Sequence, residues 1–178
     1  MYQDVLNFWF QEIGEAGWWR GDARLDRQIT QRFAELHARA TRCELYAWRT
    51  LPHGRLAEII VLDQFSRNMF RDSARAFAYD SLALALAQEA IAAHVDEALN
   101  PVERSFLYVP FMHSESPAIH QIAVGLFHAN GIEVNFDFEL KHKEIIDRFG
   151  RYPHRNSALG RASTPGELEF LKQPGSRF

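Results

Sequence analysis

The fold is decided by residues 56–65, which read LAEIIVLDQF in one-letter code. Five apolar side chains are spread around nearly the whole circumference of a helix over this stretch: Leu56, Ile59, Ile60, Leu62 and Phe65. A helix that is apolar on all sides has no face suited to water, so other elements must enclose it. We therefore expect residues 56–65 to form the central helix of the fold.

Helical patterns and helix signals continue on both sides of this stretch. An apolar pattern over residues 5–13 stops at Gly14, and Asp22 is a suitable N-cap for a second long helix. Asn100-Pro101 has the form of an N-cap followed by proline at the first helical position. No stretch alternates with the period of a strand between hairpin turns. The sequence predicts one all-α domain over residues 1–178, with about eight or nine helices in antiparallel pairs.

Composition narrows the classes of function. The chain has 178 residues, a net charge of -3 and 47% hydrophobic residues, and an acidic balance argues against a nucleic-acid surface, which needs a broad basic face. Cys43 is the single cysteine, so an internal disulfide and a thiolate zinc cluster are excluded. The first residues lack a signal-peptide pattern, and no segment has the length and apolarity of a membrane span. We expect a cytoplasmic protein that binds neither nucleic acid nor membrane.

A first polar cluster lies at the C-terminal end of the central helix. There Asp63 and Arg67 are four residues apart and can pair along one helical face. Polar side chains that continue a buried helix need partners, and four are candidates here for lining a ligand site: Asp63, Gln64, Arg67 and Asn68. The same residues could instead form a buried polar network that ties helices together. Arginine suits a ligand site because its planar fork grips a carboxylate or phosphate with two parallel bonds.

A second polar cluster lies in residues 148–161, a loop broken by glycine and proline. It holds no acidic residue, but it contains four arginines and a histidine: Arg148, Arg151, His154, Arg155 and Arg161. Such a loop should attract anions even in an acidic chain. We expect Arg151 and Arg155 to contact an anion, with Asn156 as an orienting group.

A third cluster, His113-Ser114-Glu115, follows a proline. Pro110 lies inside the helix that begins at Pro101 and is expected to kink or end it near Val109, which would place this cluster at a bend. If the protein catalyses a reaction, its acid and base candidates are His113, Glu115 and His154.

A metal site is a weaker alternative for these histidines. His113, His142, His154 and Glu115 would supply three nitrogens and one oxygen, but without the close helical spacing that makes a metal motif specific. His142 itself is expected on a solvated helix face beside Lys141 and Lys143, where Glu139 would pair with Lys143. The phosphate-loop, dinucleotide-loop and zinc-protease motifs are missing, so the sequence names no cofactor and no metal.

Together these segments resemble a bacterial family called domain of unknown function 924. The resemblance rests on residues 62–68, 110–115 and 148–156, with further matches at residues 5–10, 74–78 and 159–161. It implies an all-helical arrangement of antiparallel helix pairs similar to tetratricopeptide repeats, and it implies no established activity.

The three polar clusters support three interpretations of function. The first is a small anionic ligand held by Arg67, Arg151 and Arg155, with Gln64, Asn68 and Asn156 orienting it. The second is a protein-interaction scaffold, in which the arginines grip an acidic partner peptide or a chain terminus. The third is a purely structural polar network. Whether the protein is an enzyme is left open.

Overall fold

The computed structural model describes residues 1–19 and 21–176, which form α-helices joined by shorter 3₁₀ and π-helical turns. The first half of the chain contains α1 (Tyr2–Leu6), α2 (Glu15–Trp18), α3 (Ala23–Thr41), α4 (Pro52–Ile60), α5 (Ser66–Met69) and α6 (Asp80–Ala92). The second half contains α7 (Pro101–Met112), α8 (Pro117–Asn130), α9 (Glu133–Phe149) and α10 (Pro165–Phe170). The shorter turns are η1 (Asn7–Ile13), η2 (Tyr46–Thr50), η3 (Val61–Phe65), η4 (Ala74–Ala76), η5 (Val95–Ala98) and η6 (Pro153–Arg155). No strand occurs in these residues, and the all-α prediction is confirmed.

The central helix is where the sequence predicts it. α4 continues directly into the π-helical η3, and every residue from Leu56 to Ser66 is buried. Phe65, near its end, packs against Phe8, Trp9 and Phe33, with ring centroids 4.9 to 6.1 Å apart. Aromatic rings of α3, η1 and the central helix therefore form one core.

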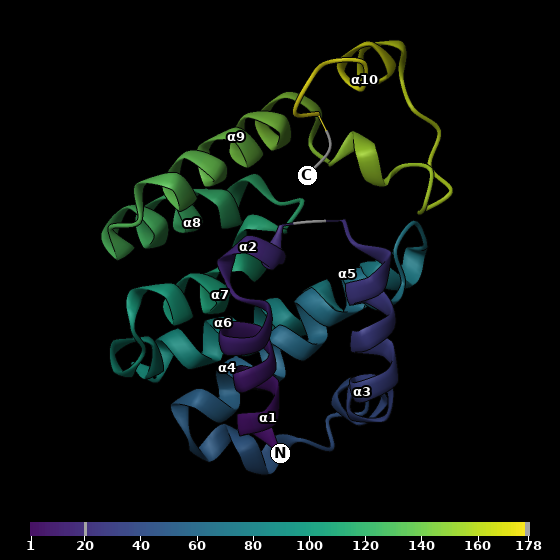
Figure 1. The fold of residues 1–178 in the computed structure, drawn as a ribbon. Helices are drawn as coiled ribbons and strands as arrows, with labels where there is room; N and C mark the ends of the chain where they lie inside the picture. The colour runs from purple at the N-terminus through teal and green to yellow at the C-terminus, as the bar shows by residue number, and fades with distance from the viewer. Residues whose placement is uncertain (20, 177–178) are drawn as a thin grey trace.

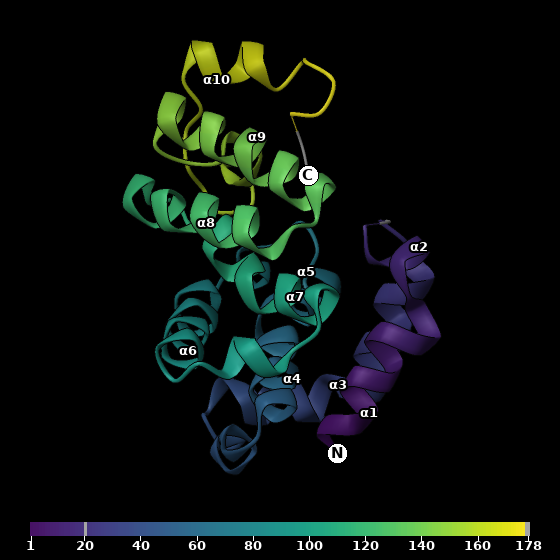
Figure 2. The same cartoon turned by 90° about the vertical axis from the view of Figure 1, so that its left-hand side faces the viewer.

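Helices α7, α8 and α9 stack one against the next, with α10 beyond α9 and with α6 and α4 on the other side of α7 (Figure 2). Short connections at residues 113–116 and 131–132 reverse the chain between them. Gly131 ends α8 with a φ of 76°, a left-handed conformation that glycine adopts without strain. The N-terminal α1 and α2 run up the middle of the view in Figure 1 with α3 to their right, and Figure 2 shows that these helices lie on one side of the molecule.

The N-terminal caps follow the sequence signals, but the effect of Pro110 does not. Asp22 caps α3, and Asn100 forms a reciprocal capping box with Glu103 at the start of α7. Pro110 was expected to kink or end α7 near Val109, and the second alternative is wrong, because α7 continues through Pro110 to Met112. Pro110 is buried among other helices, and this tertiary packing holds the helical path despite the missing N–H group. His113 therefore lies at the end of α7.

Within the described residues, no helix has both the length and the apolar composition needed to cross a membrane.

Candidate functional site

Near its C-terminal end, the central helix carries a buried carboxylate, Asp63, which lies in the π-helical turn η3. Its oxygens contact His113 Nδ1 at 2.8 Å, Gln64 Nε2 at 2.7 Å and Arg67 Nη1 at 3.1 Å. The last contact is the pair that their spacing predicts. Burial alone would raise the pKa of Asp63, but Arg67 and His113 lower it, and the pKa lies below its ordinary value. Asp63 is therefore ionised and connects η3 to α5 and to the end of α7.

Two arginines from distant segments share a second carboxylate, Asp80 at the start of α6. Arg67 donates two hydrogen bonds of 2.9 Å to its two oxygens, and Arg155 donates one of 3.2 Å. The ring of Phe77 lies beside both guanidinium groups, at 5.6 and 4.7 Å from its centroid. Asp63, Arg67, Asp80, His113 and Arg155 thus form one assembly, which we call the Arg–His cluster.

Arg155 is the least satisfied member of the Arg–His cluster. Its side chain is 6% exposed, and its buried Nε makes no hydrogen bond within the described part of the chain. Burial lowers the pKa of Arg155, and the nearby charge of Arg67 lowers it further. A buried N–H donor without a partner is uncommon in folded proteins and calls for an explanation.

His113 is held by its carboxylate partner in one orientation. Because ionised Asp63 accepts from Nδ1, the proton of neutral His113 is on Nδ1, which leaves Nε2 as the basic nitrogen. Burial and Arg67 lower the pKa of His113 more than Asp63 raises it. This arrangement, a base oriented by a buried acid, is one that enzymes use for proton transfer.

Two further histidines border the Arg–His cluster. Burial and the positive charge of Arg155 are among the causes that lower the pKa of His142 and of His154 to about 3. The expectation that His142 lies on a solvated face is wrong: it is buried, and its Nδ1 bonds to the Phe138 carbonyl at 2.7 Å. The reason is that α8 covers one side of α9, and residues after Gly150 cover another (Figure 2).

A buried network that sequence reasoning missed lies next to these histidines. His120 is fully buried, with Nδ1 2.7 Å from Glu139 and Nε2 2.9 Å from the Ser114 carbonyl. Tyr152 donates from its hydroxyl to the Met112 carbonyl at 2.6 Å. The expected surface pair between Glu139 and Lys143 is therefore wrong, because Glu139 is buried opposite His120. A signal in the sequence for this network was Tyr152, a large aromatic residue between the arginines of the loop.

Other predicted site residues lie in structural contacts around the cluster. Glu115 accepts from both Arg161 Nη atoms, at 2.6 and 2.9 Å, and from the Tyr152 backbone N–H at 2.8 Å. Arg151 contacts Glu167 of α10 at 2.6 and 2.9 Å. Asn156 accepts from Arg161 at 2.9 Å and donates to Ser163 at 3.0 Å. The structure thus brings Asp63, Arg67, His113 and Arg155 together, with His154 beside them, and places Glu115, Arg151 and Asn156 in bonds that anchor residues 150–167.

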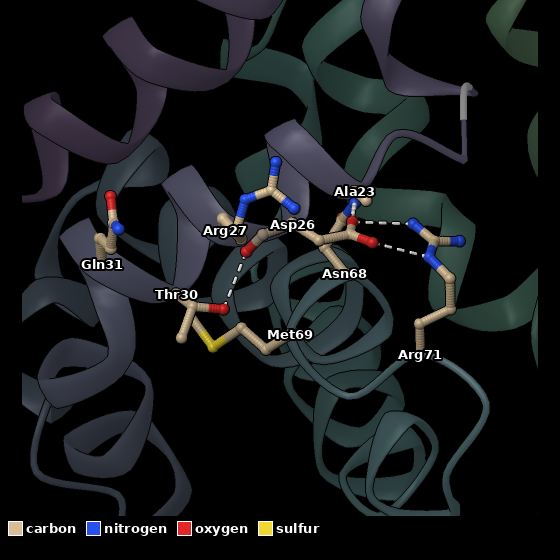
Figure 3. A pocket seen from close by; sticks show the side chains of 8 residues that line it. All are labelled: Ala23, Asp26, Arg27, Thr30, Gln31, Asn68, Met69 and Arg71. Atoms are coloured by element: carbon tan, nitrogen blue, oxygen red, sulfur yellow. Dashed lines mark hydrogen bonds and ion pairs between the residues drawn. The ribbon is translucent and has the colours of Figure 1, made fainter.

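Asn68 lies apart, at an open hollow between α3 and α5 (Figure 3). It donates to Asp26 at 2.9 Å, and Arg71 grips the same carboxylate with two bonds of 2.8 Å. The hollow has a volume of about 460 Å³ and is lined by Ala23, Asp26, Arg27, Thr30, Gln31, Asn68, Met69 and Arg71. Its one acidic side chain is already neutralised by Arg71.

The histidines do not assemble into a metal centre. Across residues 1–19 and 21–176, no group of three or more histidine, cysteine, aspartate or glutamate side chains is placed to hold a metal ion. The set of His113, Glu115, His142 and His154 is broken because Glu115 lies against Arg161 and Tyr152.

Comparison with known proteins identifies the family of this chain. The model of a family described as "Bacterial protein of unknown function (DUF924)" matches residues 5–175. The chain belongs to this family. A DUF924 match over residues 5–175 includes every member of the Arg–His cluster.

A solved structure extends the comparison to three dimensions. The chain is similar to a protein of unknown function, ATU0120, from Agrobacterium tumefaciens, with 38% sequence identity and a TM-score of 0.92. The likeness covers 96% of each chain. A search of curated proteins gives no match to this member of DUF924.

Proposed function

We propose that this DUF924 protein binds a small anion, a phosphate or a carboxylate, at the Arg–His cluster. The observation that carries the proposal is the bonding of Arg155. This buried arginine has one hydrogen bond of 3.2 Å to a carboxylate that Arg67 already grips with two bonds, and its Nε has no partner among the described residues. A guanidinium offers five N–H donors, so Arg155 retains capacity for a further acceptor.

The guanidinium of Arg67 beside Arg155 favours an anion over a neutral ligand. Arg67 lowers the pKa of Arg155, whereas Asp80 raises it, and an anion that accepts from both guanidinium groups would further offset their repulsion. Low exposure strengthens each charge-assisted bond, because less water competes for the donors. The ligand is small, because the cluster is enclosed: Asp63 is 1% exposed and Arg155 is 6% exposed.

The proposed anion contacts are Arg67 and Arg155. Gln64 donates to Asp63 and so holds that carboxylate toward His113. Arg151, which sequence reasoning included, contacts Glu167 instead, and we leave it out of the proposed site. We also propose a cytoplasmic location, which the exposed, unpaired Cys43 supports.

The test is thermal unfolding of the wild type and of Arg155→Gln with inorganic phosphate, sulfate, and small mono- and dicarboxylates. At about 100 times its dissociation constant, a ligand adds roughly 2.7 kcal/mol, which raises the melting temperature of a chain of this size by about 5 to 10 °C. The proposal expects this shift in the wild type and its loss in Arg155→Gln.

Arg32→Gln is the matched control, because Arg32 forms an exposed ion pair with Glu12 far from the cluster. Arg32→Gln should show the same increase in melting temperature with the ligand as the wild type. A panel in which every anion leaves the wild-type melting temperature unchanged, or shifts all three proteins equally, would overturn the proposal.

A further inference from the structure

The charges of the Arg–His cluster balance before any ligand arrives. Arg67 and Arg155 contribute two positive charges, and Asp63 and Asp80 contribute two negative charges at 2.9 to 3.2 Å from them. The neighbouring pair of Glu115 and Arg161 is also neutral. An anion added to this enclosed site would leave it with a net negative charge, which burial penalises heavily. A compensating positive charge would remove that penalty.

His113 is the group placed to supply that charge. Its Nδ1 is 2.8 Å from the ionised carboxylate of Asp63, a contact that favours the charged imidazolium. Its side chain is 14% exposed, so it is more open to solvent protons than Asp63 or Arg155. The fixed bond at Nδ1 leaves Nε2 as the atom that accepts a proton.

The groups that act on His113 come from every element around it. Asp63 of η3 and Asp80 of α6 favour its charged form, whereas Arg67 of α5 opposes it. His142 of α9 and His154 of η6 also interact electrostatically with His113. Arg155 of η6 interacts with Arg67 and Asp80, two of the groups that act on His113. Beyond His142, His120 of α8 is bonded to Glu139 of α9.

We propose that His113 takes up one proton at Nε2 when an anion binds beside Arg155, so that the site binds the anion and the proton together. This inference rests on the proposed function. The proton comes from the buffer, neutral imidazole becomes imidazolium, and the positive charge gained by His113 offsets one negative charge of the ligand. The preferred ligands are therefore anions that stay fully ionised while His113 becomes charged.

The free protein keeps His113 neutral. Burial and Arg67 lower its pKa, and these effects outweigh the opposing effect of Asp63. An anion near Arg67 offsets that positive charge and adds a negative one, so both changes raise the affinity of His113 for a proton. His142 and His154 are poorer acceptors, since burial holds the pKa of each at about 3.

The experiment is isothermal titration calorimetry with sulfate, an anion whose own charge is constant in the neutral pH range. Titrations at about pH 7 in two buffers with different ionisation enthalpies give the number of protons taken up per sulfate bound. For the wild type we expect a value approaching one, and an affinity that falls up to tenfold per pH unit as pH rises above the pKa of the complex. His113→Gln should bind sulfate with no proton uptake and with little dependence on pH.

His53→Gln serves as the control, because His53 is a surface histidine whose side chain is 45% exposed. It should behave like the wild type. Sulfate binding without proton uptake in the wild type would overturn this inference and leave the proposed function standing. Proton uptake that persists in His113→Gln would also overturn it. If sulfate and the other anions all fail to bind the wild type, the proposed function itself fails.

Discussion

Acid should destabilise this protein well above the pH at which its carboxylates titrate, because two buried histidines and one partly buried histidine are held neutral. Burial is the largest cause in each case, and it lowers the pKa of His37 to about 4 and those of His142 and His154 to about 3. An unfolded chain returns each imidazole to a pKa of about 6.5. Below that value the unfolded state binds more protons than the folded state, so stability falls as pH falls.

The magnitude follows from the difference between these pKa values. At about pH 5, each unfolded histidine lies about 1.5 pH units below its pKa, whereas the folded one is still mostly neutral. At about 1.4 kcal/mol per pH unit, the free energy of unfolding falls by roughly 2 kcal/mol for each histidine and by about 6 kcal/mol for the three. That sum is comparable to the whole stability of a typical domain, about 5 to 15 kcal/mol. At about pH 6 the same relation gives roughly 0.8 kcal/mol for each histidine.

The assay is urea unfolding followed by circular dichroism at several pH values between about 7.5 and 5. His37→Gln should show a pH dependence that is smaller by about 2 kcal/mol at pH 5, because this variant lacks the imidazole that bonds Ser66 Oγ at 2.8 Å. Burial raises the pKa of Glu139, so this residue makes the protein more stable as pH falls, opposite to the histidines. Glu139 is present in both proteins, so its contribution cancels in the difference between the wild type and His37→Gln. A wild-type free energy of unfolding that changes by less than about 1 kcal/mol from pH 7 to 5 would refute the reasoning.

Three substitutions test other parts of the structure by chemical denaturation. Gly54→Ala should lower the free energy of unfolding by about 1 to 3 kcal/mol, since the added Cβ would overlap the Trp48 carbonyl. An unchanged urea midpoint would contradict the close approach of η2 and α4. Asp80→Asn should lower the free energy of unfolding by about 3 to 5 kcal/mol, because it leaves Arg155 buried without its carboxylate. A decrease of less than about 1 kcal/mol would show that the Asp80 carboxylate does not stabilise the Arg–His cluster. Tyr152→Phe should lower the free energy of unfolding by about 1 to 3 kcal/mol, because the Met112 carbonyl loses the hydrogen bond from the Tyr152 hydroxyl. An unchanged free energy of unfolding would argue against that hydrogen bond.

The helices were predictable because their signals are local. The all-round apolar pattern of residues 56–65 requires enclosure whatever encloses it, and the capping boxes at Asn100 and Thr164 depend on side chains three residues apart. The path of α7 through Pro110 was not predictable, because neighbouring helices rather than local sequence maintain it.

The site was predictable in its residue types but not in its pairings. Residues 63–68 were predicted to need polar partners, segment 113–115 to hold acid and base candidates, and loop 148–161 to attract an anion. The structure gives most of these side chains partners within the chain. Which groups meet depends on helix packing: Asp80 carries no local signal, yet it bonds both Arg67 and Arg155, which lies 75 residues after Asp80 in the sequence. His142 was misplaced for the same reason, since two lysine neighbours suggested a wet face that packing in fact covers.

The central claim, that Arg155 holds an anion, is tested most directly by nuclear magnetic resonance of its side chain. The Nε–H signal of Arg155, assigned by its absence from Arg155→Gln, is followed during titration with sulfate or phosphate. The account predicts a saturable shift of this signal with the dissociation constant found by calorimetry, and an unchanged Nε–H signal for Arg32. A stationary Arg155 signal while the protein binds the anion would place the ligand elsewhere and contradict the account.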